Sequence, residues 1–173
     1  RPVVEISYID FLGTCFDQVM NQAAKLRYMY GGMVSLPLVI RTQCGAGLGN
    51  GAQHSQSLEA LLAHIPGIRV VMPSNAYDAK GLLLRAIRDN NPVVFIEHKA
   101  LYKTKCEVPE EPYECDYTCS IKREGSDVSI ITYSAMVNQA LKAADKLAEE
   151  GISAEVVDIR TIEPLDEDSI IRS

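Results

Sequence analysis

The sequence predicts an α/β protein in which a doubly wound, mostly parallel sheet is followed by the start of a second α/β domain. Short apolar runs alternate with segments of helical periodicity up to about residue 98, and the alternation resumes after residue 126. Strands that alternate with helices are typical of a parallel sheet covered on both faces. The 173 residues, 47% of them hydrophobic and 23% charged, are enough for a packed core and exclude fibrous, disordered and disulfide-scaffold proteins.

The first part of the chain supplies four apolar runs that we expect to be strands and three periodic segments that we expect to be helices. The strands are expected at 1–6, 37–40, 68–72 and 92–97, and the helices at 10–30, 57–64 and 75–89. Gly31-Gly32 and Pro66-Gly67 are the stop signals after the first two helices. The glycine-rich segment 41–56 is expected to be a loop.

Residues 98–125 have no sustained period, and their prolines and acidic residues indicate an extended linker. A new unit follows, with strands expected at 127–132 and 154–159 and a helix at 135–150 closed by Gly151. We therefore divide the chain into a first domain (1–105), a linker (106–125) and the beginning of a second domain (126–173). The chain opens within a strand and stops before the second domain is finished, so we expect both ends to be cut.

Charge and cysteine content restrict the partners. A net charge of −6 and a pI near 5.1, with scattered basic residues, argue against nucleic-acid and membrane-surface binding. No apolar run approaches the ~20 residues of a membrane span. The five cysteines form no C-x-x-C pair and favour a reducing compartment. Cys115 and Cys119 could form a redox or metal pair, but loop cysteines without such a role are the more common case.

The loop at 41–56 is the leading candidate for chemistry. It follows a predicted parallel strand, and ligands bind beyond the carboxyl ends of such strands. It contains His54, with neutral polar neighbours, as the candidate catalytic residue; a structural histidine is the alternative, which spacing alone favours. Its glycines fit neither G-x-G-x-x-G nor a P-loop. His64 and His98 are expected to be packing histidines, and Glu5 and Glu97 solvated strand ends.

Five segments together resemble one family, the β subunits of the E1 component of thiamine-diphosphate-dependent 2-oxo acid dehydrogenases. These segments are Arg1-Pro-Val-Val-Glu, Asp17-Gln-Val-Met-Asn-Gln-Ala-Ala-Lys, Gly51-Ala-Gln-His-Ser-Gln-Ser, His64-Ile-Pro-Gly and Asp89-Asn-Asn-Pro-Val-Val-Phe-Ile-Glu. The resemblance covers nearly the whole chain. It implies a pyrimidine-binding domain followed by the first part of a transketolase C-terminal domain.

The resemblance also implies the site. His54 would stabilise the substrate carbonyl oxygen and act as a proton donor in transfer to lipoamide. Phe11 would pack on the aminopyrimidine ring of thiamine diphosphate, and Ser7 would lie on the same wall, where the family more often has a larger apolar residue. A catalytic glutamate would come from a segment upstream of Arg1. Structural potassium would bind, chiefly through backbone carbonyl oxygens, at Leu38, Ala86, Asp89 and Asn91, with an empty or water-filled turn as the equal alternative.

The implied partners are an α subunit that holds the diphosphate and Mg²⁺, a second β subunit in an α2β2 heterotetramer, and the lipoyl and subunit-binding domains of the E2 acyltransferase. The chain alone would be inactive. The implied reaction is oxidative decarboxylation of pyruvate, or acetoin cleavage, with acyl transfer to lipoyl-E2. A branched-chain 2-oxo acid dehydrogenase, another transketolase-type thiamine enzyme and a non-catalytic pairing module are the alternatives. The expected compartment is the bacterial cytoplasm or the mitochondrial matrix.

Overall fold

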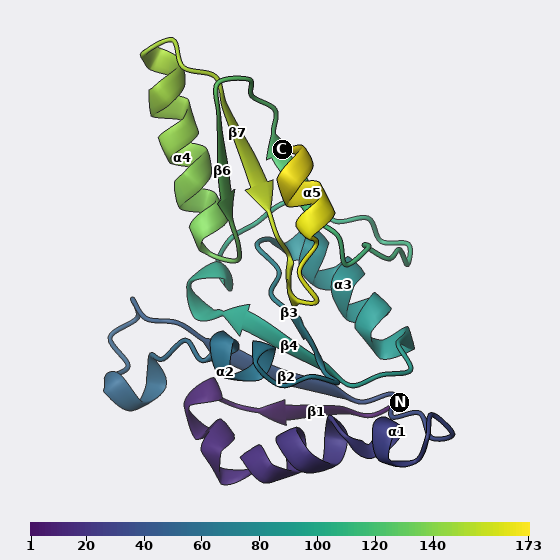
Figure 1. The fold of residues 1–173 in the computed structure, drawn as a ribbon. Helices are drawn as coiled ribbons and strands as arrows, with labels where there is room; N and C mark the ends of the chain where they lie inside the picture. The colour runs from purple at the N-terminus through teal and green to yellow at the C-terminus, as the bar shows by residue number, and fades with distance from the viewer.

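The structure, a computed structural model, describes all residues 1–173 and contains two sheets (Figure 1). The larger sheet has the order β1-β2-β4-β3-β8. Its strands are β1 (Val3–Ile6), β2 (Val39–Cys44), β3 (Arg69–Val71), β4 (Val93–His98) and β8 (Thr161–Glu163). The first four strands are mutually parallel, and β8 pairs antiparallel with β3. The predicted α/β class with a mostly parallel sheet is confirmed.

Both faces of the central strands β2, β4 and β3 are largely buried. One face packs against the segment 9–29 and α2 (Glu59–Ala63), and its core includes Ile9, Leu12, Ile40, Leu62 and Val94. The other face packs against α3 (Ala76–Arg88) and residues of the 113–117 segment. Since strands covered on both faces are apolar throughout, the continuous apolar runs predicted their positions well.

The first helical segment differs from the single helix expected at 10–30. It consists of a 3-10 helix (Ile9–Thr14), a π-helical turn (Gln18–Ala23) and the short α1 (Leu26–Met29). The break follows Gly13. There the Thr14 hydroxyl donates a hydrogen bond to the Phe11 carbonyl, and the Cys15 thiol donates one to the Leu12 carbonyl. Side chains that bond to the backbone in this way compete with a regular helix. The predicted stop is confirmed, because Gly31 and Gly32 both have positive φ.

Strand β2 is longer than predicted. The sequence assigned Arg41 and the residues after it to a loop, but pairing with β4 continues to Cys44, which lies opposite His98. Thr42 and Cys44 are buried whereas Arg41 and Gln43 are half-buried. This alternation with polar side chains concealed the strand, and the loop begins only at Gly45.

The smaller sheet belongs to the second unit and has the order β5-β7-β6. Strands β6 (Val128–Thr132) and β7 (Ala154–Asp158) are parallel and are connected by α4 (Met136–Glu149), as the sequence predicted. Strand β5 (Ser120–Arg123) pairs antiparallel with β7 and lies in the stretch predicted to be an extended linker. The sequence did not indicate this strand, because four mostly polar residues give no periodic signal.

The two units are joined by more than the connecting chain. Strand β8, which follows β7, returns to the edge of the larger sheet, and α5 (Glu167–Arg172) comes after it (Figure 1). None of the helices is both long and apolar enough for a membrane span.

Candidate active site

Three neighbouring parallel strands end at one edge of the larger sheet. Strand β1 leads into residues 7–11, β2 into the glycine-rich loop that begins at Gly45, and β4 into residues 99–101. Since β1, β2 and β4 are adjacent, the segments that follow them meet at this edge. This arrangement brings His54 next to Phe11, although 43 residues separate them in the sequence.

The centre of the site is a group of three rings. The His54 imidazole lies 4.8 Å from the Tyr8 ring and 5.3 Å from the Phe11 ring, both in edge-to-face geometry. Tyr8 and Phe11 are themselves 6.3 Å apart. Such contacts orient an imidazole without hydrogen-bonding it. Phe11 remains 43% exposed, so its ring is accessible to a ligand.

The loop around His54 is attached to the protein through its backbone. The amide of Gln56 donates to Asp10 Oδ1 at 3.0 Å, and the Gln56 carbonyl accepts from the Gly45 amide at 3.0 Å. Lys99 Nζ donates to the His54 carbonyl. Burial raises the pKa of Asp10, but the bond from the Gln56 amide and the charge of Lys99 outweigh it, so the pKa lies below its ordinary value.

Tyr8, Asp10 and Lys99 were not predicted from the sequence. Each of them, however, lies within four residues of a predicted strand end at the ligand-binding edge, which is the signal that could have identified them. Ser7, which the resemblance placed on the cofactor wall, is exposed directly after β1 and next to Tyr8.

The other two histidines differ from each other. His98 packs against Gly45 so closely that a Cβ on Gly45 would lie 2.1 Å from His98 Nε2. Its Nδ1 accepts the Ala100 amide at 3.2 Å, and burial holds its pKa below the usual value. The expectation of a packing histidine is correct for His98. It is wrong for His64, which is exposed at the carboxyl end of α2, where the helix stops before Pro66.

The four residues predicted to bind potassium lie at one corner of the larger sheet. The Leu38 carbonyl accepts from the Val93 amide, and Ala86 is in the last turn of α3. Asp89 follows the helix, and its carbonyl accepts from the Arg1 guanidinium at 2.7 Å. The Asn91 amide donates to Asp89 Oδ1. The Asp89 carbonyl, one of the predicted ligands, therefore already faces a positive charge.

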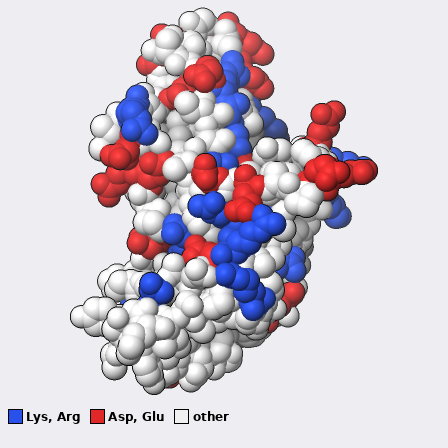
Figure 2. Space-filling view, turned by 90° about the vertical axis from the view of Figure 1, so that its right-hand side faces the viewer, with Lys and Arg blue, Asp and Glu red and all other residues white.

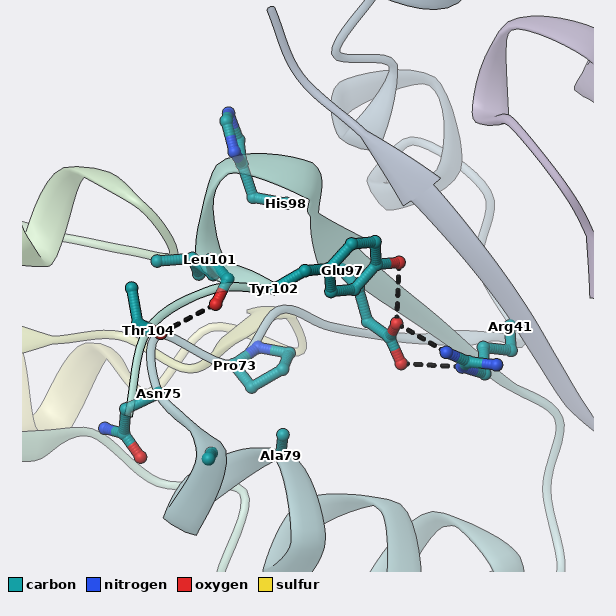
Figure 3. A pocket seen from close by; sticks show the side chains of 10 residues that line it. Arg41, Pro73, Asn75, Ala79, Glu97, His98, Leu101, Tyr102 and Thr104 are labelled. Carbon is teal, nitrogen blue, oxygen red and sulfur yellow. Dashed lines mark hydrogen bonds and ion pairs between the residues drawn. The ribbon is translucent and has the colours of Figure 1, made fainter. Parts of the chain in front are cut away.

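A pocket of about 270 Å³ lies between the end of β4, the segment that follows it and the start of α3 (Figure 3). Glu97 accepts two hydrogen bonds from Arg41, at 2.7 and 2.8 Å, and one from the Tyr102 hydroxyl at 2.9 Å. Arg41 also pairs with Glu5. Glu97 is thus mostly buried in an ion pair and not a solvated strand end as expected, whereas Glu5 is exposed. His98 points away from this pocket.

The cysteines form no disulfide, and no three His, Cys, Asp or Glu side chains are grouped to hold a metal ion. Burial raises the pKa of Cys44 to about 12 and that of Cys119 to about 11. Cys115 packs below Gly81, where it fills the space of a missing Cβ. These are features of unreactive packing thiols.

Comparison with known proteins gives the family. Residues 1–105 match the transketolase pyrimidine-binding domain, and residues 118–173 match the transketolase C-terminal domain. Acetoin:2,6-dichlorophenolindophenol oxidoreductase subunit beta from Cupriavidus necator is 56% identical in sequence, and the match covers all of this chain and 52% of that protein. Pyruvate dehydrogenase E1 component subunit beta from Bacillus subtilis is 54% identical, and the match covers all of this chain and 54% of that protein. The chain therefore spans about half the length of these relatives.

A solved structure described as a split gene transketolase, inactive beta4 tetramer, has the same fold. It superposes with a TM-score of 0.79 at 26% identity, over 99% of this chain and 53% of that one. The order of the two matched domains agrees with the two sheets described above. The chain belongs to the transketolase pyrimidine-binding domain family, and its residues 118–173 match the transketolase C-terminal domain.

Proposed function

We propose that the chain is part of the β subunit of the E1 component of a 2-oxo acid dehydrogenase complex. The proposed reaction is thiamine-diphosphate-dependent oxidative decarboxylation of pyruvate, or acetoin cleavage, with acyl transfer to lipoyl-E2. One observation carries the proposal: His54 lies beside an accessible Phe11 at the ligand-binding edge of the sheet. The names of relatives with 46–56% identity support it.

The residues at this edge fit the cofactor. A partly exposed phenylalanine ring can pack on the planar aminopyrimidine, and Tyr8 and Ser7 are next to it along the chain. When bound, thiamine diphosphate would supply the carbanion chemistry at the substrate carbonyl carbon. In the proposed enzyme the diphosphate and Mg²⁺ are held by the α subunit, and this chain covers the aminopyrimidine ring.

His54 would act on the substrate. The hydrogen bonds around it use its own backbone and its neighbours Ser55 and Gln56, which leaves the imidazole nitrogens for a substrate oxygen. From this position the ring can donate a hydrogen bond to the carbonyl oxygen and a proton during acyl transfer. Tyr8 and Phe11 would hold the ring plane while it does so.

An apolar surface supports the proposed subunit partners. The lower part of the molecule in Figure 2, at the level of β1 and α1 in Figure 1, has almost no charged side chains. Tyr28 and Met33 at the end of this helical segment are 87% and 86% exposed, and Met29 and Tyr30 are exposed beside them. Exposed aromatic residues and methionines without charges are typical of subunit interfaces. The proposed partners are an α subunit and a second β subunit, with E2 as the acyl acceptor.

Potassium is part of the proposal at Leu38, Ala86, Asp89 and Asn91. The support is the carboxyl end of α3, where the last backbone carbonyls and the helix dipole favour a cation. The Arg1 guanidinium, which donates to the carbonyls of Ile87 and Asp89, would compete with the ion. The proposed compartment, bacterial cytoplasm or mitochondrial matrix, is supported by the five free cysteines.

The role of His54 is tested with His54→Ala in the full-length α/β enzyme. We expect lipoamide-dependent activity to fall by about 100-fold or more, which is the usual contribution of a positioned general acid. His64→Ala is the control, because His64 is exposed at the carboxyl end of α2 and is not one of the three rings of the site. Normal lipoamide-dependent activity of His54→Ala would refute the proposed role.

A second candidate is a transketolase-type enzyme made from split chains, which the similarity to the split gene transketolase favours. Such an enzyme would transfer a two-carbon group between sugar phosphates instead of an acyl group to lipoamide. Turnover of sugar phosphates without lipoamide dependence would identify it.

A further inference from the structure

Lys99 is a buried lysine at the base of the loop that holds His54. It follows directly after β4, and only 4% of its surface is exposed. Burial of an ammonium group is unfavourable unless polar groups and opposite charges surround it. The neighbours of Lys99 therefore indicate why the protein has a charge at this position.

Two contacts connect Lys99 to His54. Its ammonium group donates a hydrogen bond to the backbone carbonyl of His54. The same group lies 5.0 Å from the centre of the Tyr8 ring, and that ring lies 4.8 Å from the His54 imidazole. The ammonium group of Lys99 thus fixes the backbone of His54 directly. Through a cation–π interaction it also fixes the Tyr8 ring, which contacts the His54 imidazole.

Asp10 anchors the same loop from the segment that follows β1, and the charge of Lys99 helps to hold its pKa below the usual value without an ion pair between them. One of its oxygens accepts from the Gln56 amide, two residues after His54, and the other is buried without a hydrogen-bond partner. Glu59 and Cys44 are further titratable groups of this region, with Glu59 bonded to the Tyr133 hydroxyl. Lys99 and Asp10 together hold the backbone at His54 and at Gln56.

The glycine-rich loop that carries His54 cannot fix its own conformation. Gly47, Gly49 and Gly51 have positive φ, and no atom lies within 4 Å of where their Cβ atoms would be. A chain with three such glycines has a large conformational entropy, and a few contacts must offset it. Between Gly45 and the 3-10 turn Ala52–His54, the loop is mostly exposed, so its carboxyl end carries the anchoring contacts.

We propose that Lys99 is a positioning residue for His54, while Asp10 holds the same loop at Gln56. Lys99 does not touch the substrate; it keeps the His54 imidazole against Tyr8 and Phe11 so that the ring reaches the reacting oxygen in one orientation. The geometric part of this proposal concerns this chain alone, and its catalytic consequence rests on the proposed function.

The geometric part is tested on the 173-residue chain by nuclear magnetic resonance. The sequence has three histidines, so the His54 ring signals can be assigned by substitution. We expect the nuclear Overhauser effect between the Tyr8 and His54 rings to disappear in Lys99→Met, which keeps the apolar stem but lacks the donor. It should persist in Lys99→Arg, which keeps a charged donor. Lys103→Met, a change at an exposed lysine nearby, is the control and should leave the signal unchanged.

The catalytic part is tested in the full-length α/β enzyme. We expect Lys99→Met to lower kcat for lipoamide-dependent turnover about 100-fold, since a shift of about 1 Å in a catalytic group can have this effect. The KM for the 2-oxo acid should change less than about 3-fold, because Lys99 makes no contact with substrate. Lys99→Arg should restore most of kcat, and Lys103→Met should match the wild type. A role in stability alone would lower Tm and leave kcat of the folded enzyme unchanged.

A ring contact that persists in Lys99→Met, or a wild-type kcat in that variant, would overturn the proposal. If Lys99→Met does not fold, Lys99→Gln replaces it, because a neutral amide is less costly to bury than an ammonium group and is too short to reach the His54 carbonyl. The same losses of the Tyr8–His54 ring contact and of kcat are expected in this variant. An inactive wild-type complex would refute the proposed function, while the ring contact in the chain alone would still decide whether Lys99 positions His54.

Discussion

The Ser74 hydroxyl donates a 2.5 Å hydrogen bond to the Asp158 carboxylate, and this bond joins the two units of the protein. Ser74 precedes α3 in the first unit, and Asp158 ends β7 in the second. Lys122 and Arg160 from the second unit pair with Asp78 of α3 in the same cluster. A buried polar cluster with several bonds fixes one relative arrangement of the two units.

This cluster predicts a pH-dependent stability. Burial raises the pKa of Asp158 to about 6, although the Ser74 hydroxyl and Lys122 oppose the shift. The folded state therefore holds this proton more tightly than the unfolded state. Its contribution to stability is complete below the unfolded pKa of about 4 and is lost as the pH rises through about 6. Asp78 has the opposite shift, because Lys122 and Arg160 outweigh its burial.

Asp158→Asn should remove the loss of stability that Asp158 causes as the pH rises through about 6. We expect the free energy of unfolding of the variant, relative to wild type, to increase by on the order of 2 to 3 kcal/mol between about pH 4 and pH 7. Urea unfolding of both chains at several pH values measures it. Asp116→Asn, at an exposed carboxyl group, is the control. A difference between variant and wild type that does not change with pH would contradict the assignment.

Gly45→Ala should destabilise the protein much more than Gly47→Ala. Both glycines have similar positive φ, of 95° and 101°, so both variants incur the backbone strain of about 1 kcal/mol. Only at position 45 would the new Cβ collide with the His98 ring. We expect an additional loss of about 2 kcal/mol there, as for other overpacked sites. Denaturant unfolding of the two variants measures the difference, and equal losses would show that His98 can move away freely.

Phe11→Ala should weaken thiamine diphosphate binding to the full-length α/β enzyme without destabilising the chain. The ring is 43% exposed, so its truncation leaves little cavity. We expect the Kd for the cofactor to rise about 10-fold, from the loss of ring packing of about 1 kcal/mol or more. Val128→Ala, at a residue that is 44% exposed in the second unit, is the control for titration by calorimetry. An unchanged Kd would remove Phe11 from the cofactor site.

Potassium should stabilise the corner near the carboxyl end of α3. We expect KCl to raise Tm more than NaCl at equal ionic strength, because a hard cation bound to the folded state alone shifts unfolding by mass action. Arg1→Ala should enlarge this difference, since it frees the carbonyls of Ile87 and Asp89. Equal Tm values in the two salts for both chains would argue for a water-filled turn.

The sequence predicted the fold wherever a segment is buried on both faces. The apolar runs that became β2, β3 and β4 and the amphipathic α3 and α4 were found because burial imposes a clear period. Prediction from the sequence failed where the pairing of a strand depends on residues far away in the chain. Strand β5 is held by β7, and β8 by β3, and neither short segment has a period of its own.

The site was predictable only in part for the same reason. His54 was a candidate from its place in the loop, but a single histidine in a glycine-rich loop has no feature that separates a catalytic from a structural role. The resemblance was needed to favour the catalytic role and to identify Phe11. The partners of His54 come from segments after two other strands, so Tyr8, Asp10 and Lys99 became visible only once the strand order β1-β2-β4 was known.

The most direct test of the central proposal is turnover by the full-length protein co-expressed with its α partner. Pyruvate, acetoin and 3-methyl-2-oxobutanoate would each be supplied with lipoamide, with and without thiamine diphosphate. The account predicts that pyruvate or acetoin is consumed and that consumption requires the cofactor. Failure to consume any of the three substrates with the cofactor present would contradict it.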